Sequence, residues 1–415
     1  MFLPQDLIDD LPASPPMTQP RPGSIELPES FLSAAASQSK VGMCPHNLYK
    51  YPARFAPEFA REAIRNFSQP GDLILDCFNG GGTTGVEAVA LGRRAVGYDI
   101  SSLACFLAKV KMTPLTIHDE RRLLSWSESL SELDAETALA VWAKADTEDG
   151  YYRRNLPPRA HLFFANIIAQ LAQLERPRQR QFARVVLLAV GQWALDCKSQ
   201  LPSSVAMREE YRRQLAVSLT AFRRYTWSVA KSLGVPHQAL KRHGRVVHAS
   251  SETCGAGETI AHGSVSLVVT SPPYPGVHML YHRWQLHGRR EMPVPFLLAD
   301  CRDGDGISFY SLGNRKEAGL KTYFARLQRV FTAVRPCLKA DALVVQMVAF
   351  NNPEWQLPQF LKSMESAGYR QVLPNGLEKS ADQNLWRVVP GRRWYAAINK
   401  ASAAGKEVVL FHRPV

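Results

Sequence analysis

The chain has 415 residues, of which 46% are hydrophobic, and it carries a formal net charge of +13. This length fits one large domain with an insertion, or two domains, and the composition is ordinary for a globular protein. The sequence contains no run of about 18 apolar residues and no basic segment before an apolar core at the N-terminus. We therefore expect neither a transmembrane span nor secretion.

The seven cysteines are scattered along the chain without a Cys-x-x-Cys pair. This spacing argues against a zinc site and against a disulfide framework. It favours the reducing environment of the cytosol, and we expect a cytoplasmic protein without a metal.

The excess of positive charge lies in one part of the sequence. Residues 151–245 hold 17 Lys and Arg against 4 Asp and Glu, whereas the remaining 320 residues hold 33 of each kind. A solvated helical face would account for this pattern, and so would a surface for the phosphate backbone of nucleic acid. We favour the nucleic-acid surface because of the motifs on either side of the segment.

Residues 1–40 are rich in Pro and Ser, which predicts a disordered or loosely draped arm. A helix is expected over residues 57–66. Residues 72–112 then follow the pattern strand, Gly-rich turn, helix, strand and helix, and the second strand, over 95–98, ends at Asp99. This is a β-α-β unit, whose parallel crossover is expected to be right-handed.

Residues 113–240 are predicted to be predominantly helical, because apolar residues recur at helical spacing in 162–174, 182–195 and 211–233. A helical block between strands of one sheet indicates an inserted subdomain, which we place at 113–244. The later elements are expected to be strands at 245–248, 265–269 and 342–347, helices at 323–334 and 358–367, a long polar loop at 275–321, and two closing strands, the last at 407–411. The predicted fold class is α/β, a mostly parallel twisted sheet interrupted by a helical insertion.

The segment Asp-Cys-Phe-Asn-Gly-Gly-Gly-Thr-Thr, residues 76–84, closes the first of these strands. Its glycines let the backbone turn sharply and approach a ligand where a Cβ atom would clash. The following helix presents its positive end to that ligand, and Asp99 at the next strand end can accept hydrogen bonds from ribose hydroxyls. An ordinary tight turn would explain the glycines alone. The turn and the acid together predict a nucleoside cofactor, without separating a dinucleotide from S-adenosylmethionine.

The segment Thr-Ser-Pro-Pro-Tyr, residues 270–274, closes the apolar run 265–269. Two consecutive prolines fix a rigid turn without N–H groups, so their carbonyl groups are available as acceptors. The Ser271 hydroxyl and such a carbonyl could accept both hydrogens of an aromatic amine and orient its lone pair toward an electrophilic methyl group. Tyr274 offers a flat face on which an extruded base can stack. The tetrapeptide also occurs in disordered tails, but its position after a predicted strand favours a catalytic loop.

These segments resemble the amino-methylating DNA methyltransferases, which use S-adenosylmethionine to modify cytosine N4 or adenine N6. Residues 76–84 are similar to the family's cofactor motif, with Cys77 where Pro is usual, and residues 270–274 match its catalytic motif. Residues 46–55 are similar to the segment that covers the methionine end of the cofactor. The resemblance covers roughly residues 44–112 and 245–413.

The resemblance implies a Rossmann-like methyltransferase domain over 41–112 and 245–415, with a target-recognition region in 113–244 between its halves. It implies four catalytic residues, Ser271, Pro272, Pro273 and Tyr274, of which the first two orient the amine and the last stacks on the base. The residues that it assigns to the cofactor are His46, Tyr51, Pro52, Asp76, Cys77, Phe78, Asn79, Gly80, Gly82, Thr83, Thr84, Asp99, Ile100, Ser250 and Thr270. Among these, His46 and Tyr51 are expected to close over the cofactor's tail.

One position departs from the family's pattern. Relatives often have Gly-Asp after the third strand, whereas this chain has Ala249-Ser250. The acid that would hold the adenine amino group of the cofactor is therefore missing or replaced, by Ser250 or Glu252. Weaker cofactor binding is one expected consequence.

The segment after the catalytic loop is rich in histidine, arginine and aromatic residues, namely His278, Tyr281, His282, Arg283, Trp284, His287, Arg289 and Arg290. Their spacing argues against a metal site; a loop that grips a flipped nucleotide and an ordinary packed loop both fit. The aromatic residues in 390–395 either line the base pocket or pack in the core. No Pro-Cys stands at a strand end, which argues against methylation at cytosine C5.

The predicted reaction is direct transfer of a methyl group to the exocyclic N4 of cytosine in a flipped-out base, by positioning and charge complementarity without a covalent intermediate. Cytosine is preferred because Ser in the first motif position resembles that subgroup more than the Asp of most adenine enzymes. Adenine N6 is the first alternative, and an RNA or protein methyltransferase and a non-catalytic DNA-binding protein remain open. The expected partners are double-stranded DNA and a cognate restriction endonuclease or defence-system protein, in a cytoplasmic, nucleoid-associated location.

Overall fold

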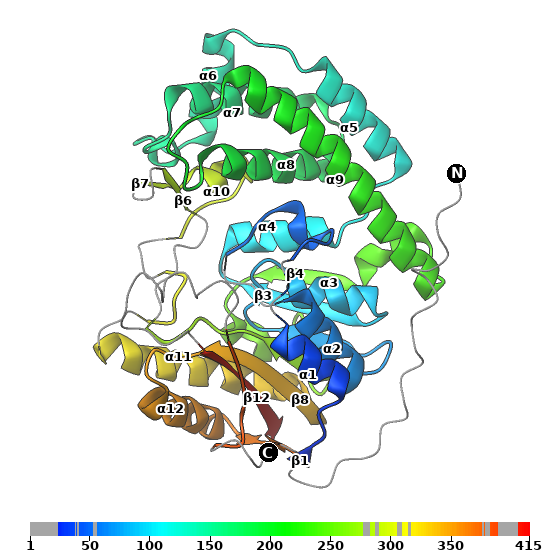
Figure 1. Ribbon diagram of the computed structural model, residues 1–415, viewed down its shortest axis with the longest axis vertical. Helices are drawn as coiled ribbons and strands as arrows, with labels where there is room; N and C mark the ends of the chain where they lie inside the picture. Colours follow the sequence, from blue (N-terminus) through cyan, green and yellow to red (C-terminus); the bar gives the residue numbers. More distant parts are fainter. Residues whose placement is uncertain are drawn as a thin grey trace.

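The computed structural model describes residues 24–37, 39, 41–52, 56–276, 283–286, 290–304, 309–313, 317–375, 377, 382–388 and 406–415. An eight-stranded sheet with helices packed on it forms one part of the molecule, and a block of helices forms the other (Figure 1). Helix α4 (Ser102–Lys111) lies between the two parts. No helix among the described residues is long and apolar enough to cross a membrane.

The strand order of the sheet is β11-β12-β8-β5-β2-β3-β4, and β9 pairs with β12. Strands β8, β5, β2, β3 and β4 are parallel, whereas β12 runs antiparallel to β8, β9 and β11. The strands are β2 (Leu73–Asp76), β3 (Arg94–Asp99), β4 (Gly244–His248), β5 (Val265–Thr270), β8 (Leu338–Ala349), β9 (Tyr369–Gln371), β11 (Leu385–Val388) and β12 (Lys406–Pro414). The predicted mostly parallel sheet is confirmed.

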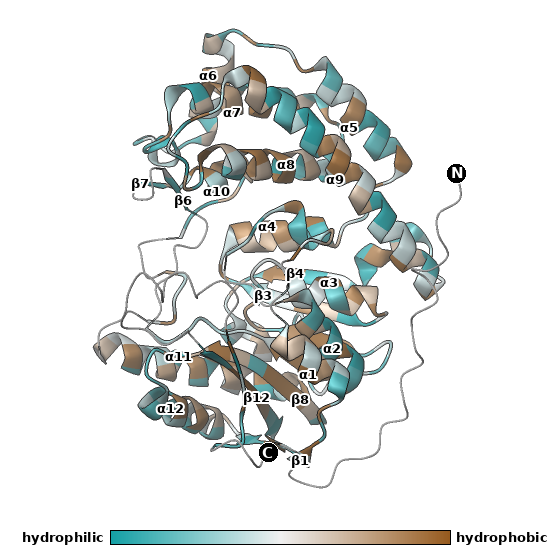
Figure 2. Cartoon of the chain, viewed as in Figure 1, coloured by the Kyte–Doolittle hydropathy of each residue, from teal (hydrophilic) through white to brown (hydrophobic). Residues whose placement is uncertain are grey.

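Both faces of the sheet are buried, because successive side chains of a strand point to opposite faces. Ile74 joins a cluster with α1 (Glu29–Ala36) and α2 (Pro57–Phe67), whereas Leu75 joins a cluster with α11 (Glu317–Val334) and α12 (Pro353–Ser366). The same alternation in β5 places Leu267 on the first face and Val268 on the second. Continuous apolar strands therefore fit a sheet between two helical layers, and Figure 2 shows β8 as predominantly hydrophobic.

Residues 24–36 correct the expectation of a disordered arm up to residue 40. Strand β1 (Ser24–Ile25) pairs with β10 (Leu373–Pro374), and α1 (Glu29–Ala36) packs on α2. The buried ring of Phe31 lies 5.5 Å from that of Phe59 and 5.9 Å from that of Phe411, measured between centroids. Burial of this aromatic face orders a segment that composition alone marks as polar. Residues 1–23 lie outside the described part of the chain.

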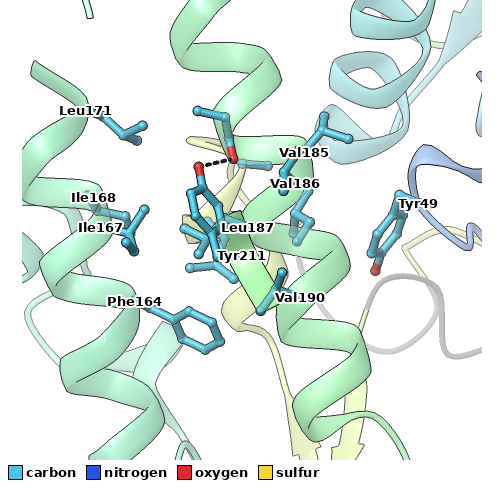
Figure 3. Packing of buried hydrophobic residues seen from close by; sticks show 14 of the residues in the cluster. Tyr49, Phe164, Ile167, Ile168, Leu171, Val185, Val186, Leu187, Val190 and Tyr211 are labelled. Atoms are coloured by element: carbon cyan, nitrogen blue, oxygen red, sulfur yellow. Dashed lines mark hydrogen bonds between the residues drawn. The ribbon is translucent and has the colours of Figure 1, made fainter. Parts of the chain in front are cut away.

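The predicted helical segment between β3 and β4 is confirmed. Its helices are α5 (Ile117–Ser129), α6 (Ala135–Ala145), α7 (Pro158–Gln170), α8 (Pro177–Leu195) and α9 (Ser204–Leu233). Apolar side chains of α7 and α8 face one another around Tyr211 of α9, whose hydroxyl donates a 3.1 Å hydrogen bond to the carbonyl oxygen of Ala183 (Figure 3). These helices share one core, to which Tyr49 also belongs.

The segment predicted as a polar loop after the catalytic motif contains ordered elements. A hairpin of β6 (Trp284–Leu286) and β7 (Arg290–Met292) precedes a short helix, α10 (Val294–Leu298), whose side chains are buried against the helical block. The indole N–H of Trp284 donates a 3.0 Å hydrogen bond to the hydroxyl of Tyr49. The expectation was wrong because the apolar run 294–299 is too short to stand out in a polar stretch.

Helix α12 begins at Pro353, five residues before the predicted start at Pro358. Pro353 occupies the first turn, where a missing N–H group costs nothing, so the helix starts there and Pro358 falls inside it. Helix α11 also begins earlier than predicted, at Glu317, and β8 extends the predicted strand at both ends.

Candidate active site

The two predicted loops meet at the carboxyl edge of the sheet, because β2 and β5 are neighbours. The Thr270 hydroxyl donates a 2.7 Å hydrogen bond to a carboxylate oxygen of Asp76, and the backbone N–H of Phe78 donates to the Thr270 oxygen at 3.2 Å. The Thr84 hydroxyl donates to the carbonyl oxygen of Val269 at 3.1 Å. The glycine-rich loop and the Thr-Ser-Pro-Pro-Tyr loop are thus fixed to each other.

Two glycines of the first loop adopt left-handed backbone conformations, with φ of 48° at Gly80 and 81° at Gly82. A Cβ atom at Gly82 would lie 2.6 Å from Cβ of Ala108 on α4, so a side chain at this position would clash. Gly82 is also the N-cap of α3 (Thr83–Ala90), the helix that starts with Thr83 and Thr84. The loop therefore depends on glycine for both its backbone shape and its contact with α4.

Asp99 ends β3 beside this loop. One carboxylate oxygen accepts a 2.7 Å hydrogen bond from the N–H of Gly80, and the other accepts a 2.8 Å bond from the N–H of Ser101. Burial raises the pKa of Asp99 to about 6, in opposition to these N–H donors. An ionised carboxylate has acceptor capacity for about four hydrogen bonds, so two hydroxyl donors of a ligand still fit.

Burial also raises the pKa of Asp76 to about 6, although Thr270 and Thr84 stabilise its charge by hydrogen bonding. Asp76 is 2% exposed and faces Thr270, so its side chain joins the two loops. The side chains of Cys77 and Asn79 are buried as well, and Asn79 lies over Gly97, where a Cβ atom would meet its amide oxygen at 2.1 Å. Cys77 packs in the core, whereas Phe78 is only partly buried.

Tyr51 covers the outer side of the glycine-rich loop. A Cβ atom at Gly81 would lie 3.1 Å from Cβ of Tyr51, and one at Gly80 would lie 3.3 Å from the Tyr51 ring. Lys111, which is 3% exposed, donates from Nζ to the carbonyl oxygen of Gly81 at 2.7 Å. The loop is thus held between a buried ammonium group and an aromatic ring.

His46 contacts α3, the helix that follows this loop. Its Nε2 atom is 2.7 Å from a carboxylate oxygen of Glu87 on α3, and Arg61 of α2 lies 2.7 Å from the other oxygen. The imidazole and the guanidinium hold the pKa of Glu87 below its usual value against the effect of burial. His46 therefore anchors its segment to α3, and among the described residues of that segment Tyr51 contacts the loop. Pro52, next to it, is half-buried.

Ser271 follows directly after β5. Its hydroxyl donates a 2.9 Å hydrogen bond to the carbonyl oxygen of Met347 on the neighbouring strand β8. A hydroxyl has one hydrogen and two lone pairs, so this bond leaves the Ser271 oxygen as an acceptor. Pro272 is buried, and Pro273 is half-buried.

Tyr274 is anchored through its hydroxyl, which donates a 2.6 Å hydrogen bond to the carboxylate of Glu407 on β12. Arg387 of β11 lies 3.4 Å from the other oxygen of the same carboxylate. The ring of Tyr274 is half-buried against the cluster that Phe78 also contacts. Glu407 and Arg387 were not predicted from sequence, because 133 positions separate Tyr274 from Glu407 and no local motif marks the pair.

The segment that departs from the family's pattern lies next to Asp99. The N–H of Ala249 donates to the carbonyl oxygen of Asp99 at 3.0 Å, and the Ser250 hydroxyl accepts from the N–H of Glu252 at 3.2 Å as the N-cap of a short 3-10 helix. Glu252 forms a 3.1 Å ion pair with Arg329 on α11. Ile100, after Asp99, is half-buried, and its carbonyl oxygen lies 3.1 Å from Nε2 of His248.

Several predicted positions lie outside the described residues, namely Tyr281, Arg289, the three histidines at 278, 282 and 287, and residues 390–395. Within the described segment that follows, Arg283 donates to both Asp303 and Glu291, and Tyr151 donates to Asp303 at 2.7 Å. This network ties the chain after the catalytic loop to the helical block. The described residues include no group of three or more His, Cys, Asp and Glu that could hold a metal.

A sequence profile described as DNA methylase (N6_N4_Mtase) matches residues 29–110. The type II methyltransferase M.MjaII of Methanocaldococcus jannaschii is 32% identical over 79 residues, 19% of this chain and 15% of the relative. M1.MboII of Moraxella bovis is 51% identical over 39 residues, 9% of this chain and 15% of the relative. M.MvaI of Kocuria varians is 31% identical over 115 residues, 27% of this chain and 24% of the relative.

The matches thus span less than a third of each relative's own length. Among solved structures, the rRNA methyltransferase aviRa of Streptomyces viridochromogenes aligns with 91% of this chain and 96% of its own, at 11% identity and a TM-score of 0.33.

A parallel sheet with a glycine-rich loop after one strand and an acid after the next is a Rossmann-like arrangement for a nucleoside cofactor. The sequence matches narrow this class: residues 29–110 are similar to the N6/N4 DNA methylases, and the matched relatives are type II methyltransferases, which supports S-adenosylmethionine as the cofactor. The residues present fit S-adenosylmethionine, since Asp99 keeps acceptor capacity for ribose hydroxyls and Gly80, which it contacts, is only half-buried.

Proposed function

We propose that this protein methylates the exocyclic N4 of cytosine in double-stranded DNA, with the target base flipped out of the duplex. The observation that carries the proposal is the contact between the two loops, in which the Thr270 hydroxyl connects Asp76 with the N–H of Phe78. This contact places the predicted amine-orienting loop beside the predicted cofactor loop on one sheet edge.

The Ser271 hydroxyl would accept one hydrogen of the target amine, because its own hydrogen is committed to Met347. The Pro272 carbonyl would accept the second hydrogen, and Tyr274 would offer its anchored ring to the base. These contacts direct the nitrogen lone pair and need no covalent intermediate. When bound, S-adenosylmethionine supplies the electrophilic methyl group. Asp99 and glycines 80–82 would hold it, and Tyr51 would cover the loop.

The helical insertion over residues 113–244 would form the target-recognition region. It stands between the cofactor half and the catalytic half of the chain and is tied to the segment after the catalytic loop by Arg283, Asp303 and Tyr151. A neutral Ser in the first motif position supports cytosine N4, since most adenine enzymes of the family have Asp there.

The test compares total DNA from cells that express the wild-type protein, Ser271→Ala or Ser266→Ala. Ser266 is a matched control because it lies on the same strand at the opposite end and bonds to Asp72. Nucleosides from hydrolysed DNA are quantified by mass spectrometry, and long-read sequencing locates the modified bases. We expect N4-methylcytosine with the wild-type protein and Ser266→Ala, and none with Ser271→Ala.

If the same samples contain N6-methyladenine instead, the proposed reaction stands but the target base is adenine. If wild-type protein that binds S-adenosylmethionine leaves no methylated base in DNA, the substrate is wrong and the proposed function falls.

A further inference from the structure

Helix α9 connects the helical block with the amino edge of the sheet, where the parallel strands begin. Its 30 residues span about 45 Å, and the helix runs diagonally from the block to the side of α3 (Figure 1). Its last turns pack through Val229 and Ala230 against Val86 of α3. Leu233 lies beside Gly92, two residues before β3 starts.

Five exposed residues near this end form what we name the α9–η5 surface, Arg224, Trp227 and Lys231 of α9 with Lys241 and Arg242 of the 3-10 helix η5 (His237–Arg242). The three α9 residues are three and four positions apart, so they share one helix face. None of the four cations forms an ion pair with a carboxylate of the described residues, whereas the neighbouring Arg223 pairs with Glu120. Residues 211–251 contain no Asp or Glu.

Trp227 is held rigidly on this surface although its side chain is 53% exposed. Its ring stacks on that of His237, with centroids 4.5 Å apart and planes within 7°. The ring nitrogens of His237 lie 2.8 Å from the Thr226 hydroxyl and 3.2 Å from the Gln238 amide, which fixes the imidazole. The exposed indole thus offers a fixed apolar contact among cations that have no carboxylate partner in the described residues, and Trp is one of the residue types enriched at binding hot spots.

The α9–η5 surface lies away from the candidate active site. Residues 237–242 lead into the start of β4, whereas Ser271 follows the end of β5, and both strands belong to the parallel part of the sheet. Strands of this length hold their two ends about 15–20 Å apart. Part of the basic excess of residues 151–245 is therefore remote from the base-methylating edge.

We propose that the α9–η5 surface binds the phosphate backbone of duplex DNA outside the methylated site. Unpaired cations select a polyanion, and phosphate contacts of this kind raise affinity without reading sequence. The indole supplies apolar contact with the sugar edge of the backbone. The choice of DNA as the polyanion rests on the proposed function.

The test measures binding of a mixed-sequence duplex of about 40 base pairs by fluorescence anisotropy, between about 50 and 200 mM salt. The double variant Lys241→Ala/Arg242→Ala is compared with Arg326→Ala/Lys362→Ala, which removes the same charge from exposed positions on α11 and α12. We expect the first variant to bind roughly 10-fold more weakly, with a log–log salt slope reduced by about 2, because two phosphate contacts are lost. Trp227→Ala is expected to weaken binding with little change in slope. The control should bind like the wild type.

Equal duplex affinity of the two double variants would overturn the inference. So would a loss of binding to an RNA hairpin without loss of duplex DNA, because the surface would then serve RNA. Unchanged cofactor affinity by calorimetry shows that each variant is folded. If the wild type methylates DNA but the surface variants bind the duplex normally, only the inference about the α9–η5 surface fails. If the wild type neither binds the duplex nor methylates DNA, the proposed function fails as well.

Discussion

The hydroxyl of Tyr274 donates a 2.6 Å hydrogen bond to the carboxylate of Glu407, which joins the loop after β5 to the closing strand β12. Glu407 is 8% exposed and also faces the buried guanidinium of Arg387. A charge-assisted bond in a poorly solvated place holds the ring of Tyr274 in one orientation. The base-stacking role proposed for Tyr274 thus depends on a residue far away in sequence.

Replacing Tyr274 by Phe should lower the methyl-transfer rate roughly 10-fold, because a hydrogen bond to a charged group contributes about 1.5–3 kcal/mol. The ring remains available, so Tyr274→Ala should lose considerably more activity. The measurement is kcat on methylatable DNA together with the cofactor Kd, which should stay unchanged in both variants.

Tyr369→Phe is the matched control, since its hydroxyl donates to the Phe331 carbonyl oxygen at 2.9 Å, outside the site. A Tyr274→Phe protein with full kcat would show that the tether to Glu407 has no part in the reaction.

Cofactor affinity should fall below about pH 6, because burial raises the pKa of Asp99 to about 6 and only the ionised carboxylate accepts hydrogen bonds with both oxygens. Below this pKa the Asp99 carboxyl group must lose its proton before the cofactor binds. The Kd should therefore rise about 10-fold per pH unit and be roughly 10-fold higher at pH 5 than at neutral pH. Calorimetry between pH 5 and 8 measures this dependence.

Asp99→Asn should bind weakly at every pH, whereas Asp72→Asn should follow the wild type. Asp72 pairs with Lys339 at the opposite end of β2, so it controls for loss of a carboxylate from the same sheet. A flat Kd down to pH 5 would exclude Asp99 as the titrating contact.

Gly82→Ala should destabilise the protein by about 2–4 kcal/mol and abolish cofactor binding, since both the left-handed φ and the clash with Ala108 oppose a side chain. Gly234, the C-cap of α9, has a φ of 63°, but no atom from the rest of the described chain lies within 4 Å of its Cβ position. Gly234→Ala should therefore cost only about 1 kcal/mol. Urea unfolding of both variants compares them, and equal losses would mean that contact with α4 does not matter at Gly82.

The elements that determine the site were predictable from sequence because they are local. Residues 76–84 carry glycines where the backbone requires them, and the apolar runs before Ser271 and Asp99 mark strands whose ends meet at one edge. Periodic apolar residues likewise revealed α7 and α8 to within five positions, and α9 with a start predicted seven residues too late.

The parts that sequence did not reveal depend on contacts between distant segments. Phe31 orders α1 only through Phe59 and Phe411, and α10 is buried only because the helical block lies against it. The ion cluster that holds His46 needs Glu87 and Arg61, which no motif joins to it.

His412 on β12 provides a test of stability that is independent of the active site. It is 1% exposed, neither ring nitrogen has a hydrogen-bond partner among the described residues, and burial lowers its pKa to about 3. The unfolded chain takes up a proton here below about pH 6.5, whereas the folded protein does not. This residue's contribution to stability is therefore fully present above pH 6.5 and decreases as the pH falls toward 3.

His412→Phe should remove this dependence, because the ring is replaced by an apolar one of similar size. Between pH 7.5 and pH 5 the buried imidazole is expected to lower the free energy of unfolding of the wild type by about 2 kcal/mol. The variant lacks this loss, so its stability relative to the wild type should rise by the same amount over that range. Urea unfolding at both pH values measures it, with His118→Phe at an exposed position of α5 as the control. If the free energy of unfolding changes with pH identically in the wild type and in His412→Phe, then His412 is protonated, or absent from the core, in solution.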